Sequence, residues 1–146
     1  MSLKEYKAKR NFQKTTEPFG KIKKAGKSLI YVVHKHAATH LHFDLRLEWK
    51  GALMSWAVQK QPSNSGVKRL AVRVEDHPID YAKFEGDIPA GEYGAGKVEI
   101  WDSGTWLPES IEKDKIVFEI KGKKLKGHFA LIKLANSDKN WLFFRR

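Results

Sequence analysis

The densest group of chemically active side chains in this sequence lies between residues 34 and 48. Four of the six histidines fall within nine residues: His34, His36, His40 and His42. From residue 40 to residue 49 polar and apolar residues alternate strictly, and alternate side chains of a β-strand share one face. The resulting polar face consists of His40, His42, Asp44, Arg46 and Glu48. The opposite face is apolar, so we expect it to face the core.

This polar face is either a solvent-facing surface or a functional site. Solvent-facing strands usually carry Lys, Glu, Thr and Ser, so two imidazoles, a carboxylate and a guanidinium at alternate positions favour a site. Imidazole and carboxylate together suit Mn²⁺, Zn²⁺ or Fe²⁺, and an arginine can donate two hydrogen bonds to a phosphate. Alternation alone nominates His40 and His42 as metal ligands. The pattern therefore predicts a metal site beside a phosphate site.

A glycine-rich stretch at residues 91–97 resembles a phosphate-binding loop, with two glycines and Lys97 at matching positions. Two features argue against an ATP site. Val98 offers no hydroxyl to a nucleotide-bound Mg²⁺, and residues 98–101 favour a strand where that loop needs a helix N-terminus. We interpret the glycines as a tight loop that leads into a strand.

Charge and composition narrow the functional class. Lysine and arginine total 28 against 17 acidic residues, which gives a net charge of +11. Such an excess favours a polyanionic partner, although a basic surface can also serve solubility. The absence of cysteine excludes disulfides and thiolate metal sites. No run is long and apolar enough for a membrane span or a secretory signal, so we expect a cytoplasmic protein. We also expect it to be a monomer.

The pattern of elements predicts a mainly β fold. Residues 1–27 are expected to form a basic arm that packs on the domain, with a turn at 17–20, and residues 28–146 to form the domain itself. Short strands separated by polar or Gly-rich turns, including one at 102–104, argue for an antiparallel barrel or sandwich. These strands are expected at 29–33, 40–49, 52–58, 69–75, 97–101, 115–121, 128–134 and 140–145. A turn or two of helix is expected at the ends of the arm or at 108–113.

Residues 75–81, taken alone, indicate an ordinary turn after a strand, in which Pro78 holds His77 extended. They also belong to a series of motifs that runs through nearly the whole chain. The main ones are VHKH at 33–36, LHFDLRLE at 41–48, SWAV at 55–58, KRLAV at 68–72, EDHP at 75–78, FEG at 84–86 and YGAG at 93–96. In this order they resemble the 3′-phosphoesterase domain family of bacterial DNA ligase D. No ligase or polymerase module fits in 146 residues, so we expect a free-standing member.

The resemblance implies an antiparallel β-barrel with short helical or irregular flanking segments. It also implies a Mn²⁺-dependent enzyme, with Co²⁺ or Zn²⁺ as other candidate metals, acting on DNA or RNA-containing primer–template ends. Such enzymes remove a 3′-terminal ribonucleoside to leave a 3′-phosphate and then hydrolyse that phosphate to a 3′-OH. The implied setting is DNA repair by non-homologous end joining, with a separate DNA ligase and polymerase as partners.

Site residues follow from the resemblance at matching positions. The implied metal ligands are His36, His42 and Asp44. The implied phosphate-contacting and catalytic residues are Arg46, Lys60, Arg69, His77 and Tyr81, supported by Glu17. His77 is expected as a general acid or a transition-state donor, and Tyr81 is expected to orient the phosphate. His36 thus replaces His40, which stays a nearby group that could face the substrate.

Three positions depart from the family pattern. His34 stands where Gln is more usual, Asn11 where Asp is usual and Gln61 where Gly is usual. On an extended strand His34 shares the face of His36, where it could hydrogen-bond substrate or ligand. The Asn11 change removes a charge near the proposed site, so we expect it to affect the ribonuclease step more than the phosphatase step.

Two other functions are compatible with parts of the sequence. A non-catalytic nucleic-acid-binding barrel accounts for the charge and the aromatic residues, but not for His36, His42, Asp44 and Arg46 together. A cupin-like metalloenzyme acting on a small molecule would also place histidines on a strand. The +11 charge argues against that second function.

Overall fold

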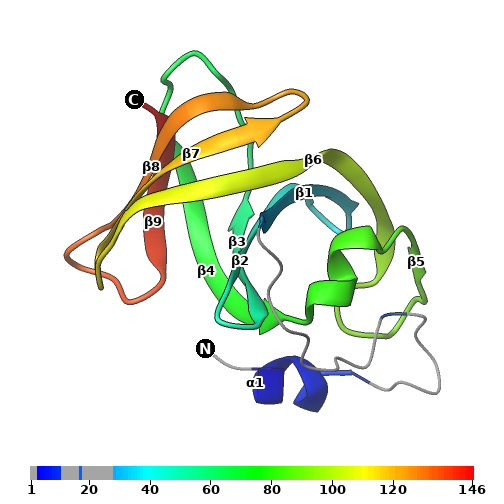
Figure 1. Ribbon diagram of the computed structural model, residues 1–146. Coiled ribbons are helices and arrows are strands. Elements are labelled where there is room, and N and C mark those ends of the chain that lie inside the picture. Colours follow the sequence, from blue (N-terminus) through cyan, green and yellow to red (C-terminus); the bar gives the residue numbers. More distant parts are fainter. Residues whose placement is uncertain (1–2, 11–16, 18–27) are drawn as a thin grey trace.

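The computed structural model describes residues 3–10, 17 and 28–146, which form a chain made mostly of strands (Figure 1). Its elements are α1 Leu3–Ala8, β1 Leu29–Ala37, β2 Leu41–Trp49, β3 Ala52–Val58, β4 Arg69–His77, the 3₁₀ helix η1 Ile79–Lys83, β5 Gly86–Ile88, β6 Gly96–Ile111, β7 Lys115–Gly122, β8 Lys126–Lys133 and β9 Asn140–Arg145. Asn11 and most of the turn predicted at 17–20 lie outside the described residues. Within the described part of the chain, no helix has the length and apolarity needed to cross a membrane.

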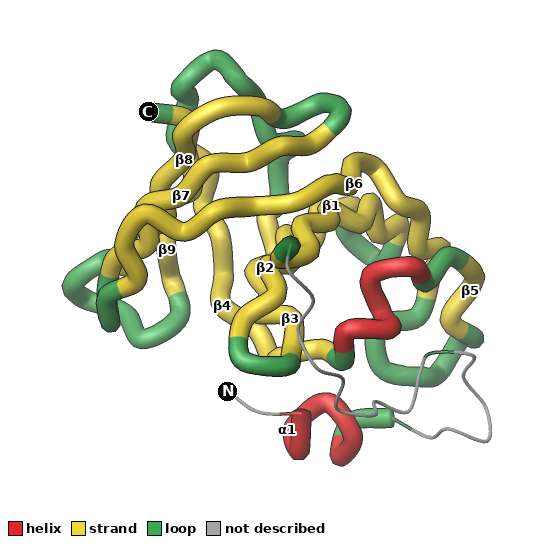
Figure 2. The backbone as a smooth tube through the Cα atoms, viewed as in Figure 1, coloured by secondary structure: helices red, strands yellow, loops and turns green. Residues whose placement is uncertain are grey.

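The strands close into an antiparallel barrel, as predicted. Neighbours follow the order β1-β2-β3-β4-β9-β8-β7-β6, and β6 pairs back onto β1 to complete the ring. The short strand β5 adds to the edge of β6 outside this ring. Figure 2 shows the strands surrounding a common interior, with α1 and η1 outside the wall formed by β1 to β4.

The hairpin predicted at Lys50 and Gly51 sets the register of the wall that carries the site. Both residues have positive φ, 51° and 84°, the backbone conformation of a type I′ turn. The turn brings Trp49 opposite Ala52. The same register then brings Arg46 opposite Ser55, three positions further along each strand.

Strand β6 corrects two predictions. It continues without a break from Gly96 to Ile111, so the turn expected at 102–104 and the helix expected at 108–113 are both wrong. Gly104 does not serve a turn here. A Cβ at this position would lie 2.0 Å from the carbonyl oxygen of Lys121, so the glycine permits a close approach of β6 to β7. The helical turn expected in the arm is present as α1.

Two apolar clusters lie on opposite sides of the barrel wall. The interior cluster includes Phe43, Leu45 and Leu47 of β2, so the apolar face of this strand faces the core as predicted. A second cluster packs η1 and α1 against the outside of β1, β3 and β6, through side chains such as Tyr81 and Tyr6. The polar face of β2 therefore lies on the outer wall, beneath the segments that cover it.

Asp102 is a buried carboxylate that ties three parts of the barrel together. It is 3% exposed and accepts a hydrogen bond from the Tyr31 hydroxyl at 2.9 Å. It also accepts bonds from the backbone N–H groups of Lys123, Lys124 and Leu125, each at 2.9 Å. Burial, followed by the charge of Asp102, raises the pKa of Tyr31, so its hydroxyl stays a donor. One side chain thus holds the turn between β7 and β8.

We predict that Asp102→Ala lowers the free energy of unfolding by about 3 kcal/mol or more, because it leaves four donors without their acceptor. Chemical denaturation monitored by tryptophan fluorescence measures the change. Asp114→Ala is the matched control, since its carboxylate is 62% exposed, and should change stability by less than about 0.5 kcal/mol. Equal effects of the two substitutions would show that Asp102 does not hold the turn.

Candidate functional site

Two imidazoles and one carboxylate converge on the outer wall of the barrel. His36 of β1 lies directly opposite His42 of β2, and Asp44 follows two residues later on the same face. The Nδ1 atom of His36 lies 3.6 Å from Oδ2 of Asp44, and Nε2 of His42 lies 3.3 Å from Oδ1. One candidate ligand atom from each residue falls within 4.8 Å of the other two. The antiparallel register thus assembles the set that the family resemblance implied.

Backbone carbonyls fix which nitrogen of each imidazole faces inward. His36 donates its Nε2–H to the Gly94 carbonyl at 2.6 Å, and His42 donates its Nδ1–H to the His40 carbonyl at 3.1 Å. In neutral imidazoles the other nitrogens then carry lone pairs, and these point at the Asp44 carboxylate. Outer hydrogen bonds of this kind orient histidine ligands in metal sites. The donor set therefore fits a divalent transition metal.

His40 itself does not belong to this set. Its side chain is exposed, and among the described residues the grouped ligand atoms come from His36, His42 and Asp44. The nomination of His40 from alternation alone is therefore wrong. The physical reason is that His42 finds its partner across the hairpin, on β1, and not two residues earlier on its own strand. His40 contributes its carbonyl group instead.

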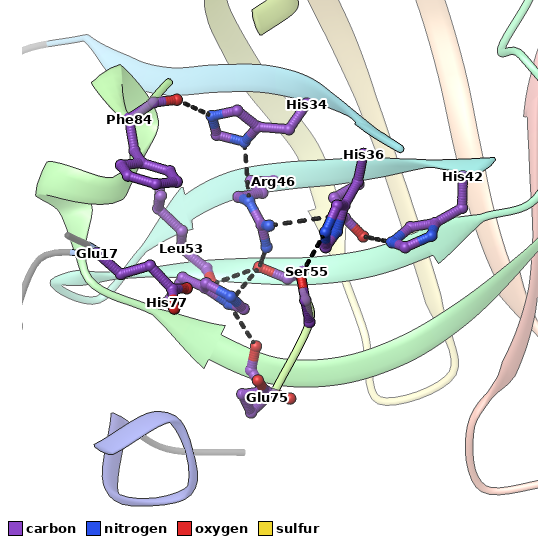
Figure 3. Close-up of polar contacts among 12 residues, drawn as sticks. Glu17, His34, His36, His42, Arg46, Leu53, Ser55, Glu75, His77 and Phe84 are labelled. Carbon is purple, nitrogen blue, oxygen red and sulfur yellow. Dashed lines mark hydrogen bonds and ion pairs between the residues drawn. The ribbon is translucent and has the colours of Figure 1, made fainter. Parts of the chain in front are cut away.

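Arg46 is held in place on three sides (Figure 3). Its Nη2 lies 3.4 Å from Oδ2 of Asp44, its Nη1 donates to Ser55 Oγ at 2.9 Å and its Nε donates to His34 Nδ1 at 3.1 Å. The Tyr81 ring lies 4.8 Å from the guanidinium carbon. Burial would raise the pKa of Asp44, but the Arg46 charge opposes this and holds the pKa well below its ordinary value. The two residues therefore form an ion pair.

His34 differs from its sequence expectation. It shares the face of His36 as predicted, but it is completely buried and does not line the cleft. Its Nε2–H donates to the Phe84 carbonyl at 3.1 Å while its Nδ1 accepts from Arg46. Burial, followed by the Arg46 charge, lowers its pKa to about 3. His34 is thus a neutral acceptor that orients Arg46 from behind.

His77 joins the site from the end of β4. Its Nδ1–H lies 3.0 Å from the Glu75 carbonyl and 3.4 Å from Ser55 Oγ, and its Nε2 accepts from Arg10 Nη2 at 3.2 Å. Burial, then the charges of Arg46 and Arg10, lowers its pKa well below the ordinary value. The residue that sequence alone placed in a turn is therefore a buried, neutral imidazole.

The N-terminal segment reaches into the same cleft through Arg10. This side chain is 5% exposed and donates from Nε to Glu17 at 2.9 Å and from Nη1 to Glu75 at 3.2 Å. It also lies over the Tyr6 ring, at 3.9 Å from the centroid. Lys9 pairs with Glu75 at 3.1 Å. Glu17, predicted in a supporting role, is buried at 4% exposure and contacts the site through Arg10.

These residues surround a cleft with a volume of about 310 Å³. The cleft is lined by His36, His42, Asp44, Arg46, His77 and Tyr81, among others. Tyr81 of η1 is 2% exposed, and burial raises its pKa well above the ordinary value, so its hydroxyl is neutral. Six of the nine predicted site residues thus meet in one place.

Three predicted residues do not line this cleft: Glu17, which contacts it through Arg10, and Lys60 and Arg69. Lys60 lies in the loop between β3 and β4, and Arg69 is the first residue of β4. Lys60 is exposed, and Arg69 donates from Nε to the Gln61 carbonyl at 3.0 Å. Arg69 lines a separate cleft at that end of the barrel. Neither residue is among those that line the cleft together with Arg46.

Sequence reasoning missed Ser55, Arg10 and Glu75. Ser55 could have been predicted from the sequence, because the predicted hairpin at 50–51 pairs it with Arg46. Arg10 and Glu75 meet only because α1 packs on β4. No local sequence pattern predicts the contact between Arg10 and Glu75, because the two residues lie 65 positions apart.

A protein-family model described as the DNA Ligase D 3′-phosphoesterase domain matches residues 34–133. The chain belongs to this family. The chain is 48% identical over 153 residues to the multifunctional non-homologous end joining protein LigD of Pseudomonas aeruginosa, covering 98% of this chain and 18% of that protein. It is 44% identical over 149 residues to the corresponding DNA repair protein LigD of Mycobacterium tuberculosis, covering 98% and 19%.

The phosphoesterase family match confirms the resemblance predicted from the motifs. The matched range includes the three grouped ligand residues as well as Arg46 and His77, while Glu17 lies before it. The chain spans about a fifth of the length of these LigD relatives. Family membership therefore concerns the phosphoesterase domain only. Sequence identity over a fifth of the relatives does not assign their other activities to this chain.

The buried neutral state of His34 makes a prediction for stability. Its pKa is about 3 when folded against an ordinary 6.5, so between these values the unfolded chain binds a proton that the folded chain does not. Stability must therefore fall as the pH falls. From pH 7 to pH 5 we expect this residue to cost on the order of 2 kcal/mol. His34→Gln should remove that loss, since an amide can accept from Arg46 and donate to Phe84 without titrating.

Urea unfolding of metal-free protein at pH 7 and pH 5 measures this difference. His40→Gln, at an exposed position, is the control and should leave the pH dependence of wild type unchanged. If His34→Gln loses as much stability between the two pH values as wild type does, His34 is not held neutral.

Proposed function

We propose that this chain is a metal-dependent phosphoesterase that processes the 3′ ends of nucleic acid strands. In this proposal it removes 3′-terminal ribonucleosides and 3′-phosphates from primer–template ends to leave a 3′-OH. The observation that carries the proposal is the convergence of His36, His42 and Asp44 beside Arg46 in one cleft. Family membership and the +11 charge support a nucleic acid as the substrate.

The three ligand residues would hold Mn²⁺, or Co²⁺ or Zn²⁺ in its place. A metal bound there would supply a Lewis acid for a phosphate oxygen and lower the pKa of a bound water. The protein's part is to keep the lone pairs of His36 and His42 directed at one point through the carbonyls of Gly94 and His40. That arrangement does not depend on the identity of the ion.

Arg46 is proposed to bind the phosphate oxygens. A guanidinium has five N–H donors, and contacts with Asp44, Ser55 and His34 use three of them. The two remaining donors would bind the phosphate at the cleft, which Arg46 lines although it is only 3% exposed. Because its position is fixed from three sides, little reorganisation is needed when a negative charge develops on the phosphate.

His77 is proposed to act in its neutral form. A general acid near pH 7 must carry a proton that it can give up, and burial beside Arg46 and Arg10 opposes such a cation. The other expected role, a donor to the transition state, needs a free N–H, but Nδ1–H is donated to the Glu75 carbonyl and Nε2 accepts from Arg10. We therefore propose a different role, in which His77 aligns Arg10 on the phosphate. Glu17 would support the same arginine from its Nε side. Tyr81 would orient the phosphate through Arg46, which its ring contacts.

The arm and the barrel are proposed to act as two parts. Residues 1–27 would pack on residues 28–146 as a basic arm, and Arg10 is the described arm residue that lines the cleft. The curated relatives carry non-homologous end joining in their names, so we propose that repair setting for this chain too. A separate DNA ligase and polymerase would then use the 3′-OH it produces. Lys60 and Arg69 would contact the strand outside the reaction centre.

The test is conversion of a labelled primer–template ending in a 3′-phosphate to a 3′-OH in the presence of Mn²⁺. Wild type should convert it, and Arg46→Gln should lose roughly 10²- to 10³-fold in rate, because a preorganised donor to the phosphate is removed. His42→Ala should lose activity as well. Arg146→Gln, at a half-exposed surface arginine, is the matched control and should keep the wild-type rate.

The proposal fails if wild type leaves the 3′-phosphate intact or if Arg46→Gln turns over at the wild-type rate. A primer ending in a ribonucleotide tests the first step separately. DNA binding that survives a chelator, without turnover under any metal, would favour a non-catalytic binding barrel. Tight metal binding without affinity for DNA would favour a small-molecule metalloenzyme.

A further inference from the structure

A second cleft opens at the barrel end beyond the loop between β3 and β4. It has a volume of about 520 Å³ and is lined by residues 61–65 of that loop and by Arg69, Trp101, Lys124 and Leu125. No acidic side chain is among the described residues that line it. By contrast, the lysine-lined cleft near Trp141 also contains Asp114 and Asp138. Of these two clefts, the second cleft carries only positively charged side chains.

Its chemistry suits a nucleotide. The ammonium group of Lys124 lies 4.6 Å from the centre of the Trp101 ring, and Arg69 contributes a guanidinium to the same cleft. An aromatic face of this kind stacks on any base, and the flanking cations match the phosphates on either side of it. The cleft therefore offers both contacts that a sequence-independent nucleic-acid site needs.

Hydrogen bonds between the two loops that form the cleft hold its walls in place. Asn64 donates to the Lys124 carbonyl at 2.7 Å and accepts from the Lys126 N–H at 3.0 Å, which ties the β3–β4 loop to the β7–β8 turn. The buried Asp102 carboxylate binds the Lys124 N–H from beneath. The two loops that form the walls are therefore fixed relative to each other before any ligand arrives.

The position of the cleft connects it to the reaction centre. The Trp101 ring packs edge-on against Phe43 at 5.6 Å, and Phe43 lies between His42 and Asp44 on β2. The cleft and the metal-ligand cluster therefore lie on opposite faces of one strand, close to the same end. Lys60 stands exposed just past the end of β3, near the partner of Phe43.

We propose that this second cleft binds a nucleotide of the substrate strand away from the 3′ end, stacking its base on Trp101 and pairing the phosphates on either side of it with Arg69 and Lys124. The proposal rests on the proposed function for the identity of the substrate. It changes the predicted role of Arg69, and of Lys60 near it, from phosphate contact in the chemical step to binding of the strand. It also explains why Arg69 lies outside the first cleft.

The experiment measures binding without turnover. A fluorescein-labelled single-stranded oligonucleotide with a 3′-OH is titrated with the protein in a chelator, and anisotropy gives Kd at several salt concentrations. The double substitution Lys124→Gln with Arg69→Gln should raise Kd roughly tenfold or more. It should also reduce the magnitude of the salt slope by about 1.4, or about 0.7 for each lost phosphate contact. The double substitution Lys113→Gln with Lys139→Gln, from the cleft near Trp141, removes the same number of charges and should match wild type.

Trp101→Phe provides a second readout, fluorescence quenching, that depends on Trp101 itself and not on small changes in packing. Stacking on Trp101 should quench part of the protein fluorescence when the oligonucleotide binds, and this substitution should remove that part while a ring for stacking remains. Three results would each overturn the proposal: unchanged Kd and salt slope in the Lys124→Gln, Arg69→Gln variant, an equal loss in the Lys113→Gln, Lys139→Gln variant, or unchanged quenching in Trp101→Phe. Because the assay contains no metal, it can fail while phosphoesterase activity stands, and it can succeed where that activity is absent.

Discussion

The negative charge of Asp44 is buried on the outer wall of a barrel, and the rest of the site is arranged around it. A carboxylate removed from water is strongly destabilised unless positive charge and hydrogen bonds compensate for the lost hydration. Arg46 supplies one positive charge at 3.4 Å, while the imidazoles of His36 and His42 direct nitrogens at the two carboxylate oxygens. With both outer nitrogens donating to carbonyls, a cation among the three groups is the simplest way to satisfy all the lone pairs.

Further layers hold these groups in place. His34 and Ser55 fix Arg46 from the wall, and the Tyr81 ring covers its guanidinium. Arg10 from the N-terminal segment then bridges Glu75 and His77. Each layer is buried, so packing restricts the side chains of the functional groups to one conformation. The same principle appears at Asp102, where another buried carboxylate fixes the turn that forms the wall of the second cleft.

Much of this arrangement could be predicted from the sequence. Strict alternation in β2 assigned its two faces correctly, and the Lys50-Gly51 turn set the hairpin register. The motifs identified the family, which in turn replaced His40 by His36. Alternation could not make that choice, because it describes one strand and the ligand set spans two. The sequence also could not distinguish Gly104 as a close-packing residue from a turn glycine. Nor could the sequence show that His34 is buried away from the cleft, because this depends on its hydrogen bonds with Phe84 and Arg46.

The central claim is that one centre holds a metal on His36, His42 and Asp44 and a 3′-terminal phosphate beside it. Pulsed electron paramagnetic resonance of the Mn²⁺-loaded protein tests this directly, since it detects nitrogen and phosphorus nuclei close to the ion. The account predicts couplings to two histidine nitrogens, loss of one of them in each of His36→Ala and His42→Ala, and a new phosphorus coupling when a 3′-phosphorylated strand is added. Mn²⁺ that shows no histidine nitrogen, or no phosphorus coupling with the saturating strand, would contradict it.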